Sequence, residues 1–137
     1  MAKKTVLVCV KKDLTHPIGW ALKEFDGKIS TRYLDNTKQL GMVLADTDDC
    51  CTVILDSTIG EESTLDFAKQ IKGDKPELKI LLIVSAGTTK EEIISLVQSK
   101  VVSGILVRPF TAEQMSDYIY KLCGFKKPTE VPWYMQT

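Results

Sequence analysis

The chain has 137 residues with 18 acidic and 18 basic side chains, so its formal net charge is zero. This balance gives no global field that would attract nucleic acid or a membrane surface. Hydrophobic residues make up 44% and charged residues 26%, which is typical of a globular domain and argues against disorder. The apolar runs are too short for a transmembrane helix, and no signal peptide is visible. We therefore expect one cytoplasmic domain.

The first part of the chain alternates strand-like and helix-like segments. Residues 5–10 (TVLVCV) form a continuous apolar run, which is typical of a strand buried on both faces. Pro17 suits the first turn of a helix over residues 16–25. Residues 28–34 alternate apolar and polar positions, with Tyr33 among the apolar ones, and this predicts an edge strand with one wet face.

A second helix follows, capped by Asn36 or Thr37. Its inward stripe is Leu40, Val43 and Leu44. Residues 51–55 (CTVIL) form a second buried run, and this run ends directly on Asp56. The helix after it carries three inward residues, Leu65, Ala68 and Ile71. Asp56 thus stands at the carboxyl end of a buried central strand.

The second half of the chain repeats the alternation. Residues 79–84 (KILLIV) are a third buried run followed by Ser85, and residues 104–107 are a last short strand followed by Arg108. Each strand precedes a helix that opens on a capping-box spacing. The spacings are Thr88 and Thr89 before Glu91 and Glu92, and Thr111 before Gln114. The apolar residues of the two helices are Ile93, Ile94 and Val97, and then Met115, Tyr118, Ile119 and Leu122.

Five strand–helix units predict a doubly wound α/β fold, in which a mostly parallel sheet carries helices on both faces. We place one domain over residues 1–123 and a tail without periodicity over residues 124–137. In such sheets, function gathers outside the carboxyl ends of the strands. Three chemically active side chains follow those ends: Asp56, Ser85 and Arg108.

These three side chains suit a phosphoryl group. Asp56 is a nucleophile toward phosphorus, Ser85 can hydrogen-bond a phosphoryl oxygen, and Arg108 can neutralise its charge. The motifs VILD, VSAG and LVRPF, together with their spacing, resemble the receiver domain of bacterial response regulators. The resemblance runs from about Thr5 to Leu122. It implies a flavodoxin-like fold with strand order 2-1-3-4-5, Asp56 as the phosphoacceptor position, and phosphate contacts at Ser85 and Arg108.

The chain departs from this family at the positions that hold magnesium. Receiver domains carry an acidic pair just after the first strand, and these positions are Val10 and Lys11 here. Mg²⁺ requires hard oxygen ligands, whereas Val10 offers none and Lys11 brings the wrong charge. Asp13 is the nearest acid, beyond the expected place. We therefore expect no metal ion and no cofactor.

Further positions near the predicted site also differ from the receiver family. The lysine of the family is replaced here by Arg108, which keeps the charge but changes reach and geometry. The family's switch aromatic, three residues before that lysine, is replaced by Ile105. The proline and glycine of the loop after the phosphoacceptor correspond to Gly60 and Thr64. A cis peptide between Arg108 and Pro109 would match the family, but the sequence leaves this open.

Without the metal, we expect Asp56 to form a permanent ion pair with Lys11 and Arg108, because opposite charges favour its ionised form and offset burial. The leading hypothesis is a stand-alone, degenerate receiver (a pseudo-receiver) that is not an enzyme and acts through contacts with a signalling protein. The resemblance places its contact surface over roughly residues 89–122.

Two alternatives stay open. In the first, the chain is a working two-component response regulator that a histidine kinase phosphorylates on Asp56 in a phosphorelay. Asp13 or water would then complete an unusual Mg²⁺ site. In the second, the chain is an enzyme or cofactor binder on the same fold. The lack of a GxGxxG or P-loop motif argues against nucleotide binding.

The other conspicuous residues have simpler explanations. The cysteines, Cys9, Cys50, Cys51 and Cys123, form no CxxC motif and suit a reduced cytosolic chain, although redox activity of the vicinal pair stays open. His16 is a helix-start residue without partners. The acidic turn of Asp46, Asp48 and Asp49 lacks the spacing of a calcium loop.

Two features lie at or near the ends of the chain. Lys11-Lys12 and Lys126-Lys127 are too few to bind nucleic acid without interleaved aromatics. Trp133 and Tyr134 in the tail either pack on the domain or form a docking segment, and the sequence does not separate these alternatives.

Overall fold

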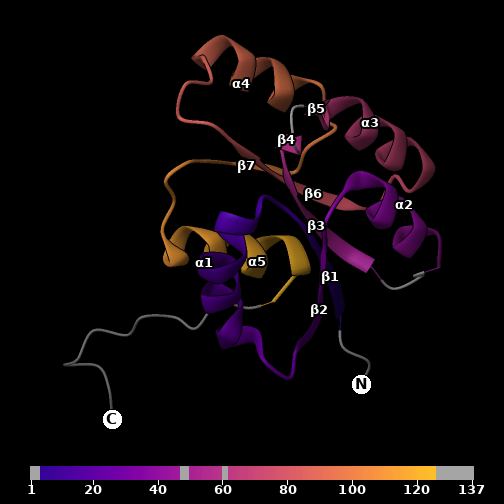
Figure 1. The fold of residues 1–137 in the computed structure, drawn as a ribbon, viewed down its shortest axis with the longest axis vertical. Helices are drawn as coiled ribbons and strands as arrows, with labels where there is room; N and C mark the ends of the chain where they lie inside the picture. Colours follow the sequence, from indigo (N-terminus) through magenta and orange to yellow (C-terminus); the bar gives the residue numbers. More distant parts are fainter. Residues whose placement is uncertain (1–3, 47–49, 60–61, 126–137) are drawn as a thin grey trace.

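A parallel sheet forms the centre of the chain (Figure 1), whose computed structural model describes residues 4–46, 50–59 and 62–125. Its strands are β1 (Lys4–Cys9), β2 (Ile29–Leu34), β3 (Cys50–Asp56), β6 (Lys79–Val84) and β7 (Gly104–Val107). The five strands lie in the order β2-β1-β3-β6-β7, with every neighbouring pair parallel. Counted along these five strands the order is 2-1-3-4-5, so the predicted flavodoxin-like α/β fold is confirmed.

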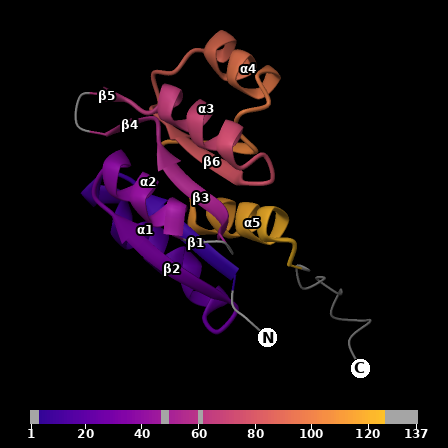
Figure 2. The ribbon, with the colours of Figure 1, turned by 90° about the vertical axis from the view of Figure 1, so that its right-hand side faces the viewer.

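Helices cover both faces of this sheet (Figure 2). They are α1 (Lys12–Leu22) with a 3-10 turn η1 (Lys23–Phe25), α2 (Thr37–Asp46), α3 (Leu65–Asp74), α4 (Lys90–Gln98) and α5 (Ala112–Cys123). α1 and α5 pack on one face, and α2 and α3 pack on the other. A short antiparallel hairpin of β4 (Thr58–Ile59) and β5 (Glu62–Ser63) follows β3, and the sequence analysis did not anticipate it.

Alternation along β1 divides the core into two layers. Val6 and Val8 pack toward α1 and α5, whereas Leu7 and Cys9 pack toward α2 and α3. Side chains of successive strand residues point to opposite faces, so a strand covered on both sides is apolar at nearly every position. This explains the apolar runs of β1, β3 and β6, in which the buried polar residues are Thr5, Thr52 and the terminal Asp56. The sequence correctly assigned these runs as buried strands.

The first helix begins earlier than predicted. α1 begins at Lys12, so Pro17 lies inside the helix and not in its first turn. Leu14 packs against the same core cluster as Ile18, one turn further along α1, and this packing extends the helix toward its N-terminus. Proline in a helix interior is costly, and here tertiary packing overrides that local preference.

The edge strand also differs from its expected pattern. β2 lies at the edge of the sheet as predicted, but Tyr33 is 47% exposed. The buried residues of this strand are those at its two ends, Ile29 and Leu34. An edge strand with helices beside it buries only what those helices cover.

The predicted helix caps agree with the structure. Thr111 and Gln114 form a reciprocal capping box at the start of α5, and the Thr89 hydroxyl accepts from the Glu92 N–H at the start of α4. Asn36 caps α2 by accepting from the Gln39 N–H at 2.9 Å. Gly124 ends α5 with φ +73°, a left-handed conformation that glycine adopts without strain.

α4 packs loosely compared with the other helices. None of its residues is buried, and Ile94 and Val97 are 44% and 58% exposed. The apolar residues that the sequence assigned to this helix therefore do not all face the core.

Some sequence-based expectations lie outside the described residues. These are the ones on Asp48, Asp49, Gly60, residues 126–127, Trp133 and Tyr134, and on the side chains of Cys50 and Cys51. In the described part of the chain, no helix is long and apolar enough to cross a membrane.

Gly104 in β7 lies directly beneath the ring of Tyr118, whose hydroxyl donates to the carbonyl oxygen of Ile105 at 3.1 Å. A Cβ at position 104 would overlap this ring. We predict that Gly104→Ala lowers the free energy of unfolding by about 1–3 kcal/mol, as overpacking does, in urea titrations followed by circular dichroism. Gly87→Ala is the control, because nothing lies within 4 Å of its added Cβ. Equal stability of the two variants would contradict this account of Gly104.

Candidate functional site

The strand register brings the candidate residues to one edge of the sheet. Cys9 pairs with Leu55, so Val10 follows β1 at the level of Asp56. Asp56 pairs with Ile83 in the neighbouring strand β6. Val84 of β6 pairs with Val107 of β7, so Ser85 and Arg108 leave the sheet side by side. Parallel strands thus gather residues that are far apart in the sequence.

The centre of the site is an ion pair between Asp56 and Arg108. Arg108 Nη2 lies 2.5 Å from Asp56 Oδ2, and the Asp56 residue is only 2% exposed. The Arg108 side chain is 23% exposed. The Arg108 backbone N–H donates to the Val84 carbonyl oxygen at 3.0 Å, and the peptide bond between Arg108 and Pro109 is cis. A hydrogen bond between a guanidinium and a carboxylate is charge-assisted, and such bonds are shorter and stronger than those between neutral groups.

Two backbone N–H groups complete the surroundings of the Asp56 carboxylate. The Lys11 N–H lies 3.4 Å from Oδ2, and the Thr58 N–H lies 3.4 Å from Oδ1. The expected ion pair between the Lys11 ammonium and Asp56 is not formed within the described residues, so this expectation is wrong. Lys11 is exposed and forms no ion pair within the described residues. Its side chain leaves the site because only the backbone at the end of β1 faces Asp56.

Asp13 joins the site through the same guanidinium. Arg108 Nη1 lies 3.4 Å from Asp13 Oδ2, and the Asp13 side chain is 67% exposed. One arginine therefore lies against two carboxylates, one buried and one in solvent. Nothing in the sequence beyond its being the nearest acid indicated that Asp13 would meet Arg108.

The donor set differs from the one that magnesium requires. Mg²⁺ prefers six oxygen ligands in near-octahedral geometry. Val10 is 5% exposed and packs in the apolar core, and Lys11 turns an N–H toward the carboxylate. Asp56 and Asp13 both bind Arg108. Within the described residues, no group of three His, Cys, Asp or Glu side chains could hold a metal ion. The residues present therefore do not fit the magnesium ion of a receiver domain.

Thr64 is a site residue that the sequence analysis did not weigh as such. It is 1% exposed, and its hydroxyl donates to the backbone carbonyl oxygen of Asp56 at 2.5 Å. Its own N–H donates to the Ser57 carbonyl oxygen at 3.0 Å. These bonds tie the start of α3 to the end of β3 and so fix the chain after Asp56. A lone threonine before a helix gave no signal of this role.

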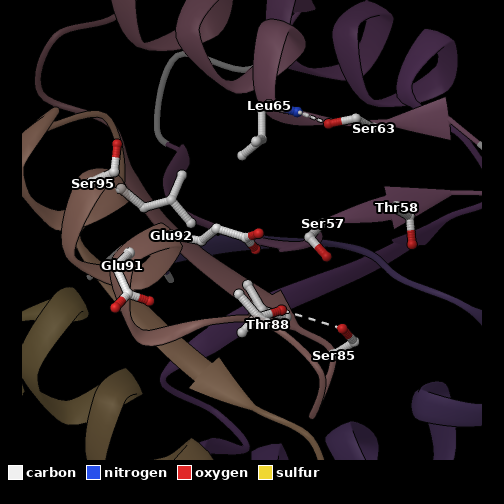
Figure 3. Close-up of a pocket in the computed structure, with 11 residues that line it drawn as sticks. Ser57, Thr58, Ser63, Leu65, Ser85, Thr88, Glu91, Glu92 and Ser95 are labelled. Atoms are coloured by element: carbon white, nitrogen blue, oxygen red, sulfur yellow. Dashed lines mark hydrogen bonds between the residues drawn. The ribbon is translucent and has the colours of Figure 1, made fainter.

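Ser85 lies at the same edge but does not bond Asp56 in the described structure. Its Oγ lies 3.2 Å from Thr88 Oγ1, within hydrogen-bond reach. Both residues line an open pocket of about 560 Å³ between the β4–β5 hairpin and α4 (Figure 3). In this view Leu65 and Glu92 point into the pocket from opposite sides, and Ser57 lies between them and Ser85. The three predicted site residues are thus neighbours, but only two of them touch.

Ile105 is the residue that the sequence motifs align with the switch aromatic of receiver domains. It is half-buried beside the cluster that packs on α2 and α3, and its carbonyl oxygen accepts from the Tyr118 hydroxyl. The aromatic ring at this part of the sheet therefore comes from α5 instead of β7.

Cys9 lies beneath the site in the core. Burial raises the pKa of its thiol from 9.0 to about 11, and the negative charges of Asp56 and Asp35 act in the same direction. The thiol is therefore held in its neutral, unreactive form at physiological pH.

Comparison with solved structures shows that the chain has the fold of response-regulator receiver domains. NtrX from Brucella abortus matches 90% of this chain with a TM-score of 0.74 at 21% identity, over 27% of its own length. A response regulator receiver domain protein from Clostridium thermocellum matches 90% of this chain with a TM-score of 0.73 at 18% identity, over 95% of its length.

A response regulator from Thermotoga maritima matches 90% of this chain with a TM-score of 0.72 at 20% identity, over 99% of its length. This chain therefore spans about a quarter of NtrX and nearly all of the other two proteins. No protein-family model matches the chain, and no curated protein matches it in sequence. The likeness establishes the fold that the sequence motifs predicted.

We predict that Arg108→Met lowers the free energy of unfolding by about 2–4 kcal/mol in urea titrations at pH 7. The substitution leaves the buried Asp56 carboxylate without its counter-charge, and partial exposure of Arg108 keeps the cost below that of a fully buried pair. Asp13→Asn is the matched control, because it removes only an exposed pair worth less than about 1 kcal/mol. If Arg108→Met costs no more than Asp13→Asn, the ion pair is not the main support of Asp56.

We also predict that stability falls as pH rises from about 9 to 11. The unfolded Cys9 thiol ionises above 9.0 and the folded one only near 11, so the unfolded state binds fewer protons in this window. The measurement is urea unfolding at several pH values for the wild type and Cys9→Ala. The wild type should lose more stability than Cys9→Ala across the window, and parallel curves would show that the raised pKa is wrong.

Proposed function

We propose that the chain is a receiver-type signalling module that acts through protein contacts, without magnesium-dependent phosphorylation of Asp56. One observation carries this proposal: Arg108 Nη2 lies 2.5 Å from the Oδ2 atom of Asp56. The carboxylate that a receiver domain offers to phosphate and metal is bound here by the chain's own guanidinium.

The chemistry of arginine supports a lasting contact. A guanidinium stays charged at all physiological pH values and presents several donors in a fixed plane, which lets Arg108 bind Asp56 and Asp13 together. A lysine ammonium is a compact point charge on a flexible stem and has no such fork. Replacing lysine by arginine therefore favours a fixed bridge over a contact that forms only with phosphate.

The free energy of metal binding also supports the proposal that Asp56 does not bind magnesium. A metal ion at this position would have to displace Arg108 from a carboxylate that is almost fully buried. Millimolar binding corresponds to about 4 kcal/mol, and this free energy would be reduced by the contact with Arg108 that the metal ion replaces. The side chains of Val10 and Lys11 supply no oxygen ligand in return, so we expect no binding in the millimolar range.

A second candidate function is a working response regulator, phosphorylated on Asp56 by a histidine kinase. Asp13 favours it, because its carboxylate and that of Asp56 already lie around one cation, the guanidinium of Arg108. In this case Ser85 and Arg108 would contact the phosphoryl group, and the partner would be the kinase.

A titration of the ¹⁵N-labelled protein with Mg²⁺ and then beryllofluoride, followed by backbone amide shifts, separates the two candidates. We predict no saturable shift at Lys11, Asp56 or Thr58 up to millimolar metal, because Arg108 keeps the carboxylate occupied. The double variant Lys11→Asp/Arg108→Lys restores an acid and a lysine at the family's positions, and we expect it to gain millimolar Mg²⁺ binding. Saturable wild-type shifts that vanish in Asp56→Asn would instead support the second candidate.

A further inference from the structure

The outer side of α1 and the edge strand β2 present two large aromatic side chains to solvent. Trp20 is 63% exposed and Tyr33 is 47% exposed. They line an open pocket of about 660 Å³ together with Thr15, His16, Gly19 and Lys23, and we name this surface the α1–β2 pocket. Aromatic residues grouped in an exposed hollow are typical of protein interaction sites.

Two contacts between lining residues shape this pocket. A Cβ at Gly19 would lie 3.2 Å from Tyr33 Oη, so glycine leaves room for the Tyr33 ring beside α1. The Lys23 ammonium lies 4.7 Å from the centre of the Trp20 ring, a cation–π contact that orients the indole. Trp20 and Tyr33 therefore line one hollow, in which the Tyr33 hydroxyl lies close to Gly19.

β2 is an edge strand of the sheet (Figure 2), and its residue Tyr33 lines the α1–β2 pocket. The Lys28 carbonyl oxygen accepts from the Lys4 N–H at 3.2 Å, so the backbone groups of Arg32, four residues on, also point toward β1. Backbone groups alternate along a strand, and those of Thr31 and Tyr33 therefore point outward. Within the described residues, no strand pairs with this side of β2. Such an edge is a template for an added strand.

The charges around the edge indicate what kind of strand fits. Among the residues that line the α1–β2 pocket, Lys23 is cationic and none is acidic. Arg32 is exposed on the opposite face of β2 from Tyr33. A second copy of this chain paired along β2 would bring Arg32 near its own copy, and like charges across a strand pair are destabilising. An acidic strand avoids this repulsion.

We propose that the α1–β2 pocket is the docking site for an extended acidic segment of a partner protein. The segment pairs with Thr31 and Tyr33 of β2, places an apolar side chain between Trp20 and Tyr33, and turns its acidic side chains toward Arg32. This inference rests on the proposed function, because it locates the protein contact which that function needs. It places the contact away from the surface over residues 89–122 that the family resemblance implied.

The test uses a synthetic hexapeptide that alternates glutamate with leucine or valine, titrated into the ¹⁵N-labelled full chain. We expect saturable shifts at the Thr31 and Tyr33 amides and at the Trp20 indole N–H. A peptide methylated on alternate backbone nitrogens should not bind, because strand addition needs its N–H groups. A peptide with lysine in place of glutamate should bind at least about tenfold more weakly, because its lysine side chains meet Arg32.

Trp20→Ala should weaken peptide binding by roughly tenfold or more, as loss of an aromatic anchor does. Met42→Ala on α2 is the control, since Met42 is 64% exposed and thus matches Trp20 in exposure, and it should leave the affinity unchanged. An unchanged affinity in Trp20→Ala, shifts confined to α4 and α5, or self-association through β2 in sedimentation would overturn the proposal. Failure of the proposed function is distinguishable, because it would show in the beryllofluoride titration whether or not the peptide binds.

Discussion

The ion pair between Asp56 and Arg108 joins the end of β3 to the end of β7, across the intervening strand β6. A buried carboxylate without a partner costs several kcal/mol, and Asp56 is almost fully buried, so the fold needs a counter-charge at this place. In this chain the counter-charge is the guanidinium of Arg108, which is a side chain of the protein itself. The arrangement of the strand ends therefore depends on a contact that needs neither metal nor phosphate.

The surroundings of the pair agree with a site that does not switch. Ser85 bonds Thr88 and not Asp56, so the β6 end is not tied to the carboxylate. The ring near β7 is Tyr118 of α5, which is held by the Ile105 carbonyl oxygen and rests on Gly104. Thr64 fixes the backbone of Asp56 from the other side. Each of these contacts is made within the chain, whereas Trp20 and Tyr33 present their aromatic side chains to solvent.

Much of the fold could be predicted from the sequence because strands covered on both faces have few polar positions. The apolar runs before Asp56 and Ser85 identified the central strands, and the spacing of Asp56, Ser85 and Arg108 identified the edge where they meet. The start of α1 could not be predicted, because packing of Leu14 outweighs the local preference of Pro17.

Details of the site depend on side-chain direction, which a sequence does not encode locally. Lys11 has the charge to pair with Asp56, yet it contributes only its backbone N–H. Asp13 reaches Arg108 because α1 begins at Lys12 and brings this carboxylate over the site. The pairing of Arg108 with Asp56 was foreseen because both follow strands that end at one edge of the sheet.

A double-mutant cycle with Asp56→Asn, Arg108→Met and the combined variant measures the central contact most directly, by urea unfolding at pH 7. If Arg108 is the permanent partner of Asp56, the cycle gives a coupling energy of about 2 kcal/mol or more, and the double variant is more stable than the sum of the two losses implies. A coupling energy near zero would show that the two residues do not hold each other, and the account of a self-occupied site would be wrong.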